Sequence, residues 1–309
     1  MRKKELDRAK KLAAALQAYL AKQRELPGLL PDGRFDTLIK QLIESRRRIE
    51  FVHHIRDSNL SPSRADPNDP IFDPLRAAIL HHRKGDYDEA FWLVFLATHF
   101  GKHVKQGWRL VRDIYGKLGQ GRWSWDTVKS DPAAFRTWLH ANQANLAGRR
   151  FSNHRKFESL KAQSKKGTAI VIESYIEWVR PHGSHAAMVR TLHKKVGQNP
   201  TEVFDAMYRS MNSVRRFGRL ARFDFLTMLG KLGIAPIDPG SAYLWHDATG
   251  PLAGARLLFG GDTNAQLSAK ELDDLLIELD GYLGVGMQTL EDALCNWQKS
   301  PSKFVSFRG

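Results

Sequence analysis

The segment FSNHRKFESL, residues 151–160, contains the side chains that an anion-binding site requires. We predict a helix here, on which His154 and Glu158 lie one turn apart and can pair. Arg155 and Lys156 supply donors for phosphate oxygens. The structural alternative is a solvated basic helix with one internal ion pair, and charge runs are more often of that kind. The candidate site residues of this segment are Asn153, His154, Arg155, Lys156 and Glu158.

In a second segment, SVRRFGRLARFDFLTMLGKLG at 213–233, a predicted helix places arginines on one face and an aspartate on another. Arg215, Arg219 and Arg222 follow i, i+4, i+7 spacing and form one basic stripe. Asp224 lies instead among apolar neighbours, where loss of hydration raises the pKa of a carboxylate unless an arginine pairs with it. Asp224 is therefore a candidate general base or a carboxylate that binds a cationic amine. The alternative is a buried structural ion pair.

The C-terminal segment MQTLEDALCNWQKSPSKFVSFRG, 287–309, carries a polar row opposite an apolar helix face. Asp292, Asn296 and Lys299 form this row at i, i+4, i+7, and solvated faces of this kind are common without any function. Cys295 has no base placed beside it by the sequence, so a cysteine nucleophile is not expected. As the single cysteine of the chain, it also excludes a disulfide framework and a cysteine-based zinc site.

Eight tryptophans are interspersed with basic residues, an arrangement that suits stacking on unpaired or flipped bases. Most tryptophans belong to protein cores, and Trp92, Trp138 and Trp178 lie on apolar faces. Trp123 and Trp125 belong to the predicted loop GQGRWSWD. They are the better candidates for contact with DNA bases.

Several familiar catalytic signatures are missing from the sequence. It contains no GxxxxGK[ST] phosphate loop, which argues against a P-loop kinase, and neither HExxH nor GxSxG. His99 and His103 have the i, i+4 spacing of metal ligands, but Gly101 between them is expected to end the helix. We expect neither a metal nor a cofactor.

The elements that position these residues are predicted to be helices throughout, so the fold class is all-α. Apolar residues recur at three- and four-residue spacing, and no stretch alternates with period two. Residues 57–74, with four prolines, form an irregular connector. Helix starts are expected after Asp131, Asn199 and Ser268, and helix ends near Gly101, Gly233 and Gly284. The predicted helices are 3–24, 34–56, 86–100, 103–117, 131–147, 152–163, 168–180, 185–196, 200–214, 217–232, 251–259, 269–283 and 287–298.

Composition adds a basic charge to this helical chain. Its 309 residues carry a formal net charge of +15, and 42% of them are hydrophobic. An excess of this size indicates a polyanionic partner, with nucleic acid ahead of an anionic membrane. No apolar run reaches the length of a membrane span and the N-terminus is not a secretory signal, so a cytoplasmic location is expected. We predict a basic helical N-terminal region at 1–85 and a helical catalytic domain at 86–309.

These segments resemble the alpha-glutamyl/putrescinyl thymine pyrophosphorylases, the phage-associated amino acid:DNA transferases of thymidine hypermodification. The resemblance spans roughly 86–309. The motifs that carry it are EAFWLVFLATHFG (89–101), FSNHRKFESL (151–160), FGRLARFDFL (217–226), ATGPLAGARLLF (248–259) and EDALCNWQKSP (291–301).

The resemblance implies a double-stranded DNA substrate in which a thymine-derived base bears a pyrophosphorylated hydroxymethyl group. An amine, either an amino acid or a polyamine, displaces pyrophosphate and becomes linked to the methylene carbon. No nucleoside triphosphate is consumed in this step. On this interpretation Arg155, Lys156, Arg219 and Arg222 neutralise the leaving group. Asp224, His154 and Asp292 are the candidates for accepting the proton of the amine.

The same resemblance extends to the helix-hairpin-helix DNA glycosylases, to which the family's helical core has been likened. Residues 248–262 are similar to a hairpin followed by the glycosylase aspartate, which would be Asp262. Two alternatives therefore stay open beside the transferase. One is a helical glycosylase-type enzyme, and the other is a non-enzymatic DNA-binding protein. The asparagine, histidine and carboxylates within basic or apolar segments argue against the last.

Overall fold

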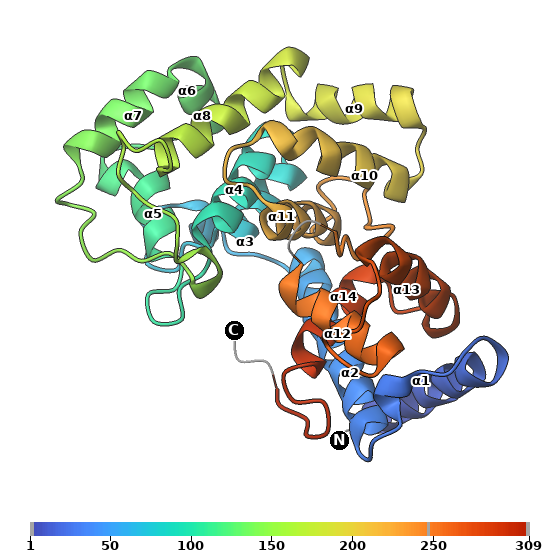
Figure 1. The fold of residues 1–309 in the computed structure, drawn as a ribbon. Coiled ribbons are helices and arrows are strands. Elements are labelled where there is room, and N and C mark those ends of the chain that lie inside the picture. Colours follow the sequence, from blue (N-terminus) through green and yellow to red (C-terminus); the bar gives the residue numbers. More distant parts are fainter. Residues whose placement is uncertain (1–2, 246–247, 307–309) are drawn as a thin grey trace. The chain divides into compact units, whose positions relative to one another are not determined.

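The spacing of apolar residues produces α-helices along the whole chain (Figure 1). The computed structural model describes residues 3–245 and 248–306, and among these it contains fourteen α-helices and no β-strand. The all-α prediction is confirmed. The helices are α1 (Lys3–Lys22), α2 (Arg34–Asp57), α3 (Pro74–Arg83), α4 (Tyr87–Phe100), α5 (Arg109–Tyr115), α6 (Trp125–Ser130), α7 (Pro132–Ala141), α8 (Thr168–Val179), α9 (His185–Val196), α10 (Pro200–Ser210), α11 (Arg219–Lys231), α12 (Thr249–Gly260), α13 (Ala269–Leu283) and α14 (Met287–Trp297).

Most predicted helices are confirmed, and the exceptions lie between residues 74 and 163. Helices α3 and α6 were not predicted, and α6 has only six residues, too few to show a period. The predicted helices 103–117 and 131–147 are shortened to α5 and α7. The helix predicted at 152–163 is wrong, because only a short 3-10 turn forms there, at Asn153–Arg155.

The predicted helix boundaries follow from capping side chains. Asp131 accepts a hydrogen bond from the backbone N–H of Ala134 at the start of α7, and Asn199 does so from Thr201 at the start of α10. Ser268 and Glu271 form a complete capping box on α13. Each side chain satisfies backbone donors that the first helical turn leaves unpaired, which stabilises a helix by about 1 kcal/mol.

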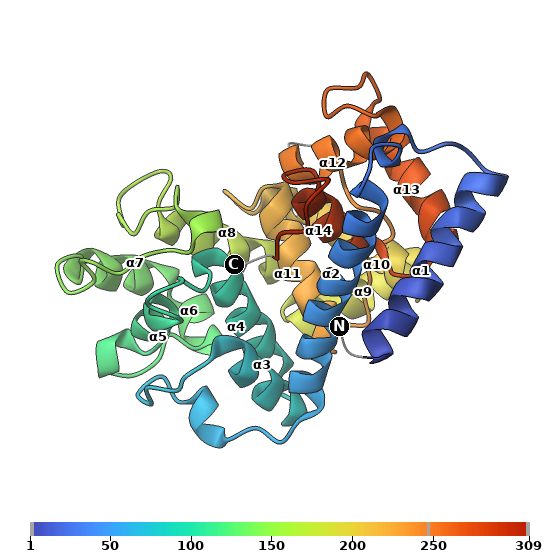
Figure 2. The same ribbon diagram turned by 90° about the horizontal axis from the view of Figure 1, so that it is seen from below.

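The chain forms two compact units, and unit 1 contains segments from both its N-terminal and its C-terminal parts. Unit 1 comprises residues 1–53 and 239–309, and unit 2 comprises residues 54–238. This division differs from the expected boundary at 85/86, since residues 1–85 are shared between the units. The reason lies in packing: α3 lies along α4 in unit 2, whereas α1 packs on α13 in unit 1 (Figure 2).

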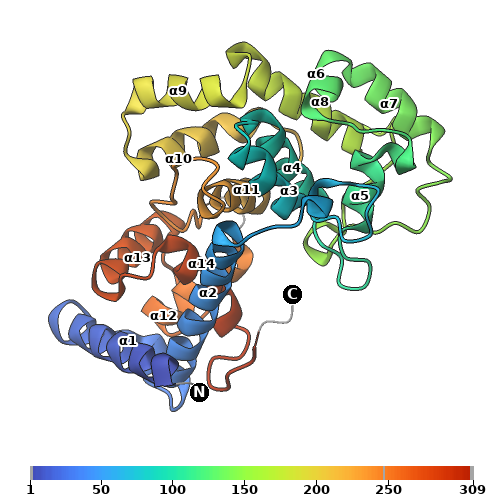
Figure 3. The same cartoon turned by 180° about the vertical axis from the view of Figure 1, so that it is seen from behind.

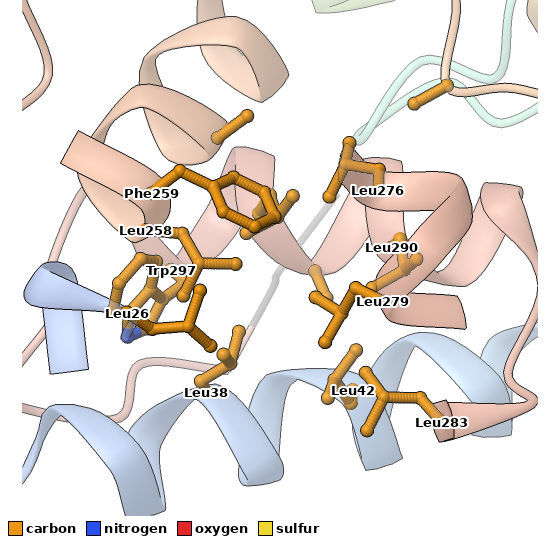
Figure 4. Close-up of a cluster of buried hydrophobic side chains, with 14 of the residues drawn as sticks. Leu26, Leu38, Leu42, Leu258, Phe259, Leu276, Leu279, Leu283, Leu290 and Trp297 are labelled. Carbon is orange, nitrogen blue, oxygen red and sulfur yellow. The ribbon is translucent and has the colours of Figure 1, made fainter. Parts of the chain in front are cut away.

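Unit 1 is built around a leucine-rich core from α1, α2, α12, α13 and α14 (Figure 4). Leu38 and Leu42 of α2 face Leu276 and Leu279 of α13, and all four are at most 1% exposed. Truncating one such leucine to alanine typically costs about 2–5 kcal/mol. A close helix contact completes this core: a Cβ at Gly254 of α12 would lie 2.4 Å from the backbone oxygen of Leu294 in α14.

Unit 2 is organised around α4, whose sequence is apolar on every side. Eleven of its residues are buried, which is typical of a central helix that other helices surround. Helices α3, α9 and α11 pack on it, and α9 runs beside α10 (Figure 3). Phe95 of α4 stacks on Tyr175 of α8, with ring centroids 3.7 Å apart. Helices α4, α8 and α11 therefore form the frame that carries the candidate residues of this unit.

A buried polar network ties three helices of unit 2 together. His185 of α9 is fully buried, and its Nδ1 lies 2.8 Å from Oδ1 of Asp88 in α4. Its Nε2 lies 2.7 Å from the Tyr175 hydroxyl of α8. Burial lowers the pKa of His185 although Asp88 opposes this effect. Because both ring nitrogens have partners within the core, we interpret the network as structural.

Candidate functional site

Arg155 and Asp224 form the centre of the candidate site in unit 2. The Nη2 atom of Arg155 lies 3.2 Å from Oδ2 of Asp224 on α11. Its Nε donates to the backbone oxygen of Thr98, near the end of α4, at 2.9 Å. The Arg155 side chain is only 11% exposed, whereas 46% of the Asp224 side chain is accessible. The arginine is thus fixed by the protein, and the carboxylate remains open to a ligand.

Electrostatics give Asp224 an unusual pKa. Desolvation by the surrounding protein raises the pKa of Asp224 above its ordinary value, although nearby positive charges oppose the effect. The opposing charges, in order of size, are Arg155, Lys231, His154 and Arg219. His154, Arg155 and Arg219 thus lie close enough to Asp224 for their charges to act on it. Such a carboxylate can accept a proton or bind a cationic amine.

The segment 151–160 is held by tertiary hydrogen bonds instead of forming a helix. The N–H of Ser152 donates to the backbone oxygen of Phe100, and the N–H of Thr168 donates to that of Ser159. The Thr168 hydroxyl also donates to the backbone oxygen of Ser159. Because its one proton is used there, the hydroxyl oxygen accepts from the Nε2–H of His99, 3.1 Å away. These bonds attach both ends of the segment to α4 and α8. They replace the local bonds on which the helix prediction relied.

Gly101 allows this segment to approach α4 closely. It ends α4 with a φ of +67°, and a Cβ there would lie 2.0 Å from Oγ of Ser152. No other residue type fits this position without moving Ser152. Gly101 thus sets the position of the turn that carries Arg155.

Glu158 pairs with Arg216 and not with His154, which corrects the predicted ion pair. Arg216 Nε lies 2.8 Å from Oε2 of Glu158, and Nη2 lies 3.0 Å from Oε1. The same Nη2 donates to the backbone oxygen of Phe157 at 3.1 Å. Arg216 has a φ of +58°, a conformation that costs a non-glycine residue of the order of 1–3 kcal/mol. Its positive φ and its partner 58 residues away leave no signal in the sequence, which is why Arg216 was missed.

The arginines of the predicted stripe occupy different environments. Arg222 is 6% exposed, donates to the backbone oxygen of Tyr208 at 3.2 Å and to Asn212, and lies over the Tyr208 ring. It therefore supports α11 and does not face solvent. Arg219 is also 6% exposed, and its guanidinium lies 4.8 Å from the centre of the Phe223 ring. Arg215 is exposed, beside a surface pocket of about 640 Å³ that Trp178 and Glu177 also line.

Trp123 and Trp125 lie in the core of unit 2, so neither ring is accessible for base stacking. They are 4% and 2% exposed. Trp123 packs on Phe135 at 5.3 Å between ring centroids, and Trp125 packs on His185 at 4.6 Å. The loop that was expected around them is short, because α6 begins at Trp125 itself.

The polar row of α14 forms a separate network in unit 1. Oδ2 of Asp292 accepts from the Ser45 hydroxyl at 2.7 Å and from Arg48, and its Oδ1 accepts from Asn296 at 3.2 Å. Lys299 Nζ donates to Oδ1 of Asn296 at 3.3 Å. The three candidates of this row do contact one another, but Asp292 already has partners on both carboxylate oxygens.

Comparison with known proteins shows to which family the chain belongs. The model of alpha-glutamyl/putrescinyl thymine pyrophosphorylase clade 3 matches residues 33–309. The chain belongs to this family. The match begins well before residue 86, so it includes the whole of α2 and the connector as well as the motifs of the resemblance. No curated protein and no solved structure matches the chain.

Membership of the thymine pyrophosphorylase family points to thymine hypermodification and to a modified thymine in DNA as substrate. Within residues 3–245 and 248–306, no three His, Cys, Asp or Glu side chains are grouped so that they could hold a metal ion. No helix of the same residues is long and apolar enough to cross a membrane. The likeness to helix-hairpin-helix glycosylases stays a prediction, and Asp262 lies on an exposed loop after α12.

Proposed function

We propose that the protein transfers an amine to DNA by displacing pyrophosphate from a pyrophosphorylated hydroxymethyluracil. Family membership supports the substrate class. The observation that carries the proposal is the Asp224 carboxylate, which is accessible, is paired with the largely enclosed Arg155 and has a raised pKa. A transferase of this kind needs a proton acceptor beside groups that stabilise an anionic leaving group, and this site combines both.

In the proposed reaction, the nitrogen lone pair of a neutral amine forms a bond to the methylene carbon of the base. The bond between that carbon and the pyrophosphate oxygen breaks, and its electrons leave with pyrophosphate. The new nitrogen centre then loses a proton to Asp224. A raised pKa makes the carboxylate a better proton acceptor near neutral pH, and general base catalysis contributes roughly 10²–10⁴-fold. His154, which lies close enough to affect the pKa of Asp224, is the second candidate for this proton.

Arg155 is proposed to stabilise the leaving pyrophosphate. A guanidinium has five N–H donors, and the bonds to Thr98 and Asp224 use two of those of Arg155. The remaining donors are already oriented, because the side chain is 11% exposed and held by two elements. Lys156 is exposed on the same turn and supplies a second positive charge. Arg219 contributes its charge from a buried position, whereas Arg222 supports α11.

Three exposed polar or basic side chains of unit 2 are proposed to bind the DNA backbone. Asn153, Lys156 and Arg215 are all exposed in unit 2. Lysine and arginine side chains there neutralise phosphates without reading the sequence. Glu158, expected at first to contact the substrate, is better assigned to positioning, because it holds Arg216. The amine co-substrate, whether an amino acid or a polyamine, belongs to the same proposal.

Asp224 is preferred to Asp292 as the base. Ser45 and Arg48 donate to one oxygen of Asp292 and Asn296 donates to the other, so both oxygens are already engaged by the protein, whereas 46% of the Asp224 side chain is accessible. We therefore assign Asp292, Asn296 and Lys299 to a polar network of unit 1, with Lys299 available to a DNA phosphate.

Mass spectrometry of nucleosides tests the proposed reaction. Duplex DNA that carries the pyrophosphorylated base is incubated with the protein and a panel of amino acids and polyamines, then digested. The proposal predicts an amine-linked nucleoside together with released pyrophosphate. An abasic site would instead indicate a glycosylase, and unchanged DNA that is nevertheless bound would indicate a binding protein.

A further inference from the structure

Phe157 is the most exposed large hydrophobic residue in the described part of the chain, with 81% of its surface accessible. It occupies the third position of a hydrogen-bonded turn, in which the N–H of Glu158 donates to the backbone oxygen of Arg155 at 2.9 Å. A phenylalanine at the tip of a turn gains nothing from the protein core. An exposed apolar side chain within a basic surface is therefore a candidate for contact with a partner.

The turn is held firmly although its tip is exposed. Arg216 donates to both carboxylate oxygens of Glu158 and to the backbone oxygen of Phe157. Arg155 fixes the start of the turn through Thr98 and Asp224. Phe157 thus lies on a turn whose backbone is held by hydrogen bonds on both sides, which lowers the entropy lost when its ring is inserted into a partner.

The charges around Phe157 identify a polyanion as that partner. Lys156 Nζ lies 5.1 Å from the centre of the Phe157 ring. The same segment, residues 145–166, carries seven Lys and Arg residues and a single acid, Glu158, which Arg216 neutralises. An apolar tip beside Lys156, within a basic segment, matches nucleic acid, because lysine and arginine bind phosphates while the ring packs between bases.

The distance to the proposed site sets the role of this ring. Arg155, which contacts Asp224, precedes Phe157 by two residues, and two residues span at most about 7 Å of backbone. A modified base must leave the duplex to reach Asp224, and its departure leaves a gap in the stack. One turn therefore carries both Arg155, the partner of Asp224, and the exposed ring of Phe157.

We propose that Phe157 enters the DNA stack and fills the space that the modified base leaves when it turns toward Asp224. The inference rests on the proposed function, since it requires duplex DNA as substrate. Insertion of apolar side chains between bases is a general way to stabilise unstacked DNA. Phe157 would then affect the opening of the duplex and not the transfer of the amine.

The test compares Phe157→Ala and Phe157→Trp with the wild type on two substrates that carry the same modified base. One is a normal duplex, and the other is a single strand, in which no base pair has to open. Ile277→Ala is the control, because Ile277 is 46% exposed on α13, whose many acidic residues repel DNA. A 2-aminopurine beside the target base reports unstacking by its fluorescence.

We expect Phe157→Ala to lower transfer on the duplex by about tenfold or more and to lose the fluorescence increase, with little change on the single strand. Phe157→Trp should retain both signals, and Ile277→Ala should resemble the wild type. Equal losses of transfer on both substrates, or no loss on the duplex, would overturn this role of Phe157. Binding of a protein, and not of DNA, at the Phe157 surface would overturn it as well. If the wild type transfers no amine to either substrate, the proposed function fails, and the fluorescence still decides whether Phe157 unstacks DNA.

Discussion

Arg155 and Asp224 are separated by 69 residues, yet the guanidinium of one lies 3.2 Å from the carboxylate of the other. Two opposing effects act on this carboxylate. Desolvation raises the pKa of Asp224, and the positive charge of Arg155 is the largest of the effects that lower it. The pair therefore sets the pH at which the proposed base is ready to accept a proton.

Removal of the Arg155 charge should shift the pH dependence of transfer. In Arg155→Met, the pKa of Asp224 rises further because its main opposing charge is lost. The acidic limb of the pH profile of kcat/KM reports the pKa of the base in the free enzyme, and it should move to higher pH. The rate should also fall, because the leaving pyrophosphate is stabilised less well. Arg180→Met, which removes an exposed arginine paired with Glu177, serves as the control. If the acidic limb stays at the wild-type pH, Arg155 does not act on the pKa of the base, which would contradict the prediction.

Arg216 should be required for its geometry as well as its charge. Arg216→Lys keeps the positive charge but cannot donate to both oxygens of Glu158 and to Phe157 together. We expect transfer to fall by about tenfold, since displacements near 1 Å have effects of this order or larger. Circular dichroism should show an intact helical fold. Arg209→Lys, at an exposed ion pair along α10, should leave the rate unchanged, and equal effects of the two substitutions would argue against a positioning role.

Stability should depend on pH through His99, which is buried between α4 and α8. Burial, with help from Arg155 and Arg216, lowers the pKa of His99 to about 3. Between about pH 6.5 and pH 3 the unfolded chain binds a proton at this residue and the folded chain does not. The free energy of unfolding should thus fall with decreasing pH, by up to about 1.4 kcal/mol per pH unit from this residue.

Denaturant unfolding across this pH range measures the contribution of His99. His99→Gln keeps a donor for Thr168 but cannot titrate, so its stability should fall less steeply with decreasing pH. His140→Gln, at an exposed position of α7, should keep the wild-type slope. Identical slopes for His99→Gln and the wild type would contradict the account.

The sequence predicts those parts of the fold that depend on local rules. Asp131, Asn199 and Ser268 start helices at the predicted places because a cap acts on backbone donors two or three residues away. The segment 151–160 departs from prediction because its ends bond to Phe100 and to Thr168, which no local rule contains. Periodicity cannot reveal such distant bonds.

The candidate site shows the same limit. Asp224 could be selected because a carboxylate among apolar neighbours is unusual, and Arg155 because it lies in a basic segment. Their contact, and that between Glu158 and Arg216, depends on how α4, α8 and α11 pack. Trp123 and Trp125 failed as stacking candidates because flanking Gly and Arg suggested a loop, while the fold placed both rings in its core.

Asp224→Asn isolates the central claim, because it removes the proton acceptor with almost no change in shape. The raised pKa means that the ionised carboxylate is unfavourable in the folded state above that pKa. The variant should therefore melt at a temperature close to or above that of the wild type at pH 7. Asp126→Asn is the matched control, since Asp126 is an acid on α6 with 84% of its side chain exposed.

The most direct measurement is the yield of amine-linked nucleoside from DNA with the pyrophosphorylated base, determined by mass spectrometry for these variants and the wild type. The account predicts product with the wild type and with Asp126→Asn, a loss of about 10²-fold or more with Asp224→Asn, and nearly equal DNA affinity for all three. Wild-type yields from Asp224→Asn would contradict the assignment of Asp224 as the base.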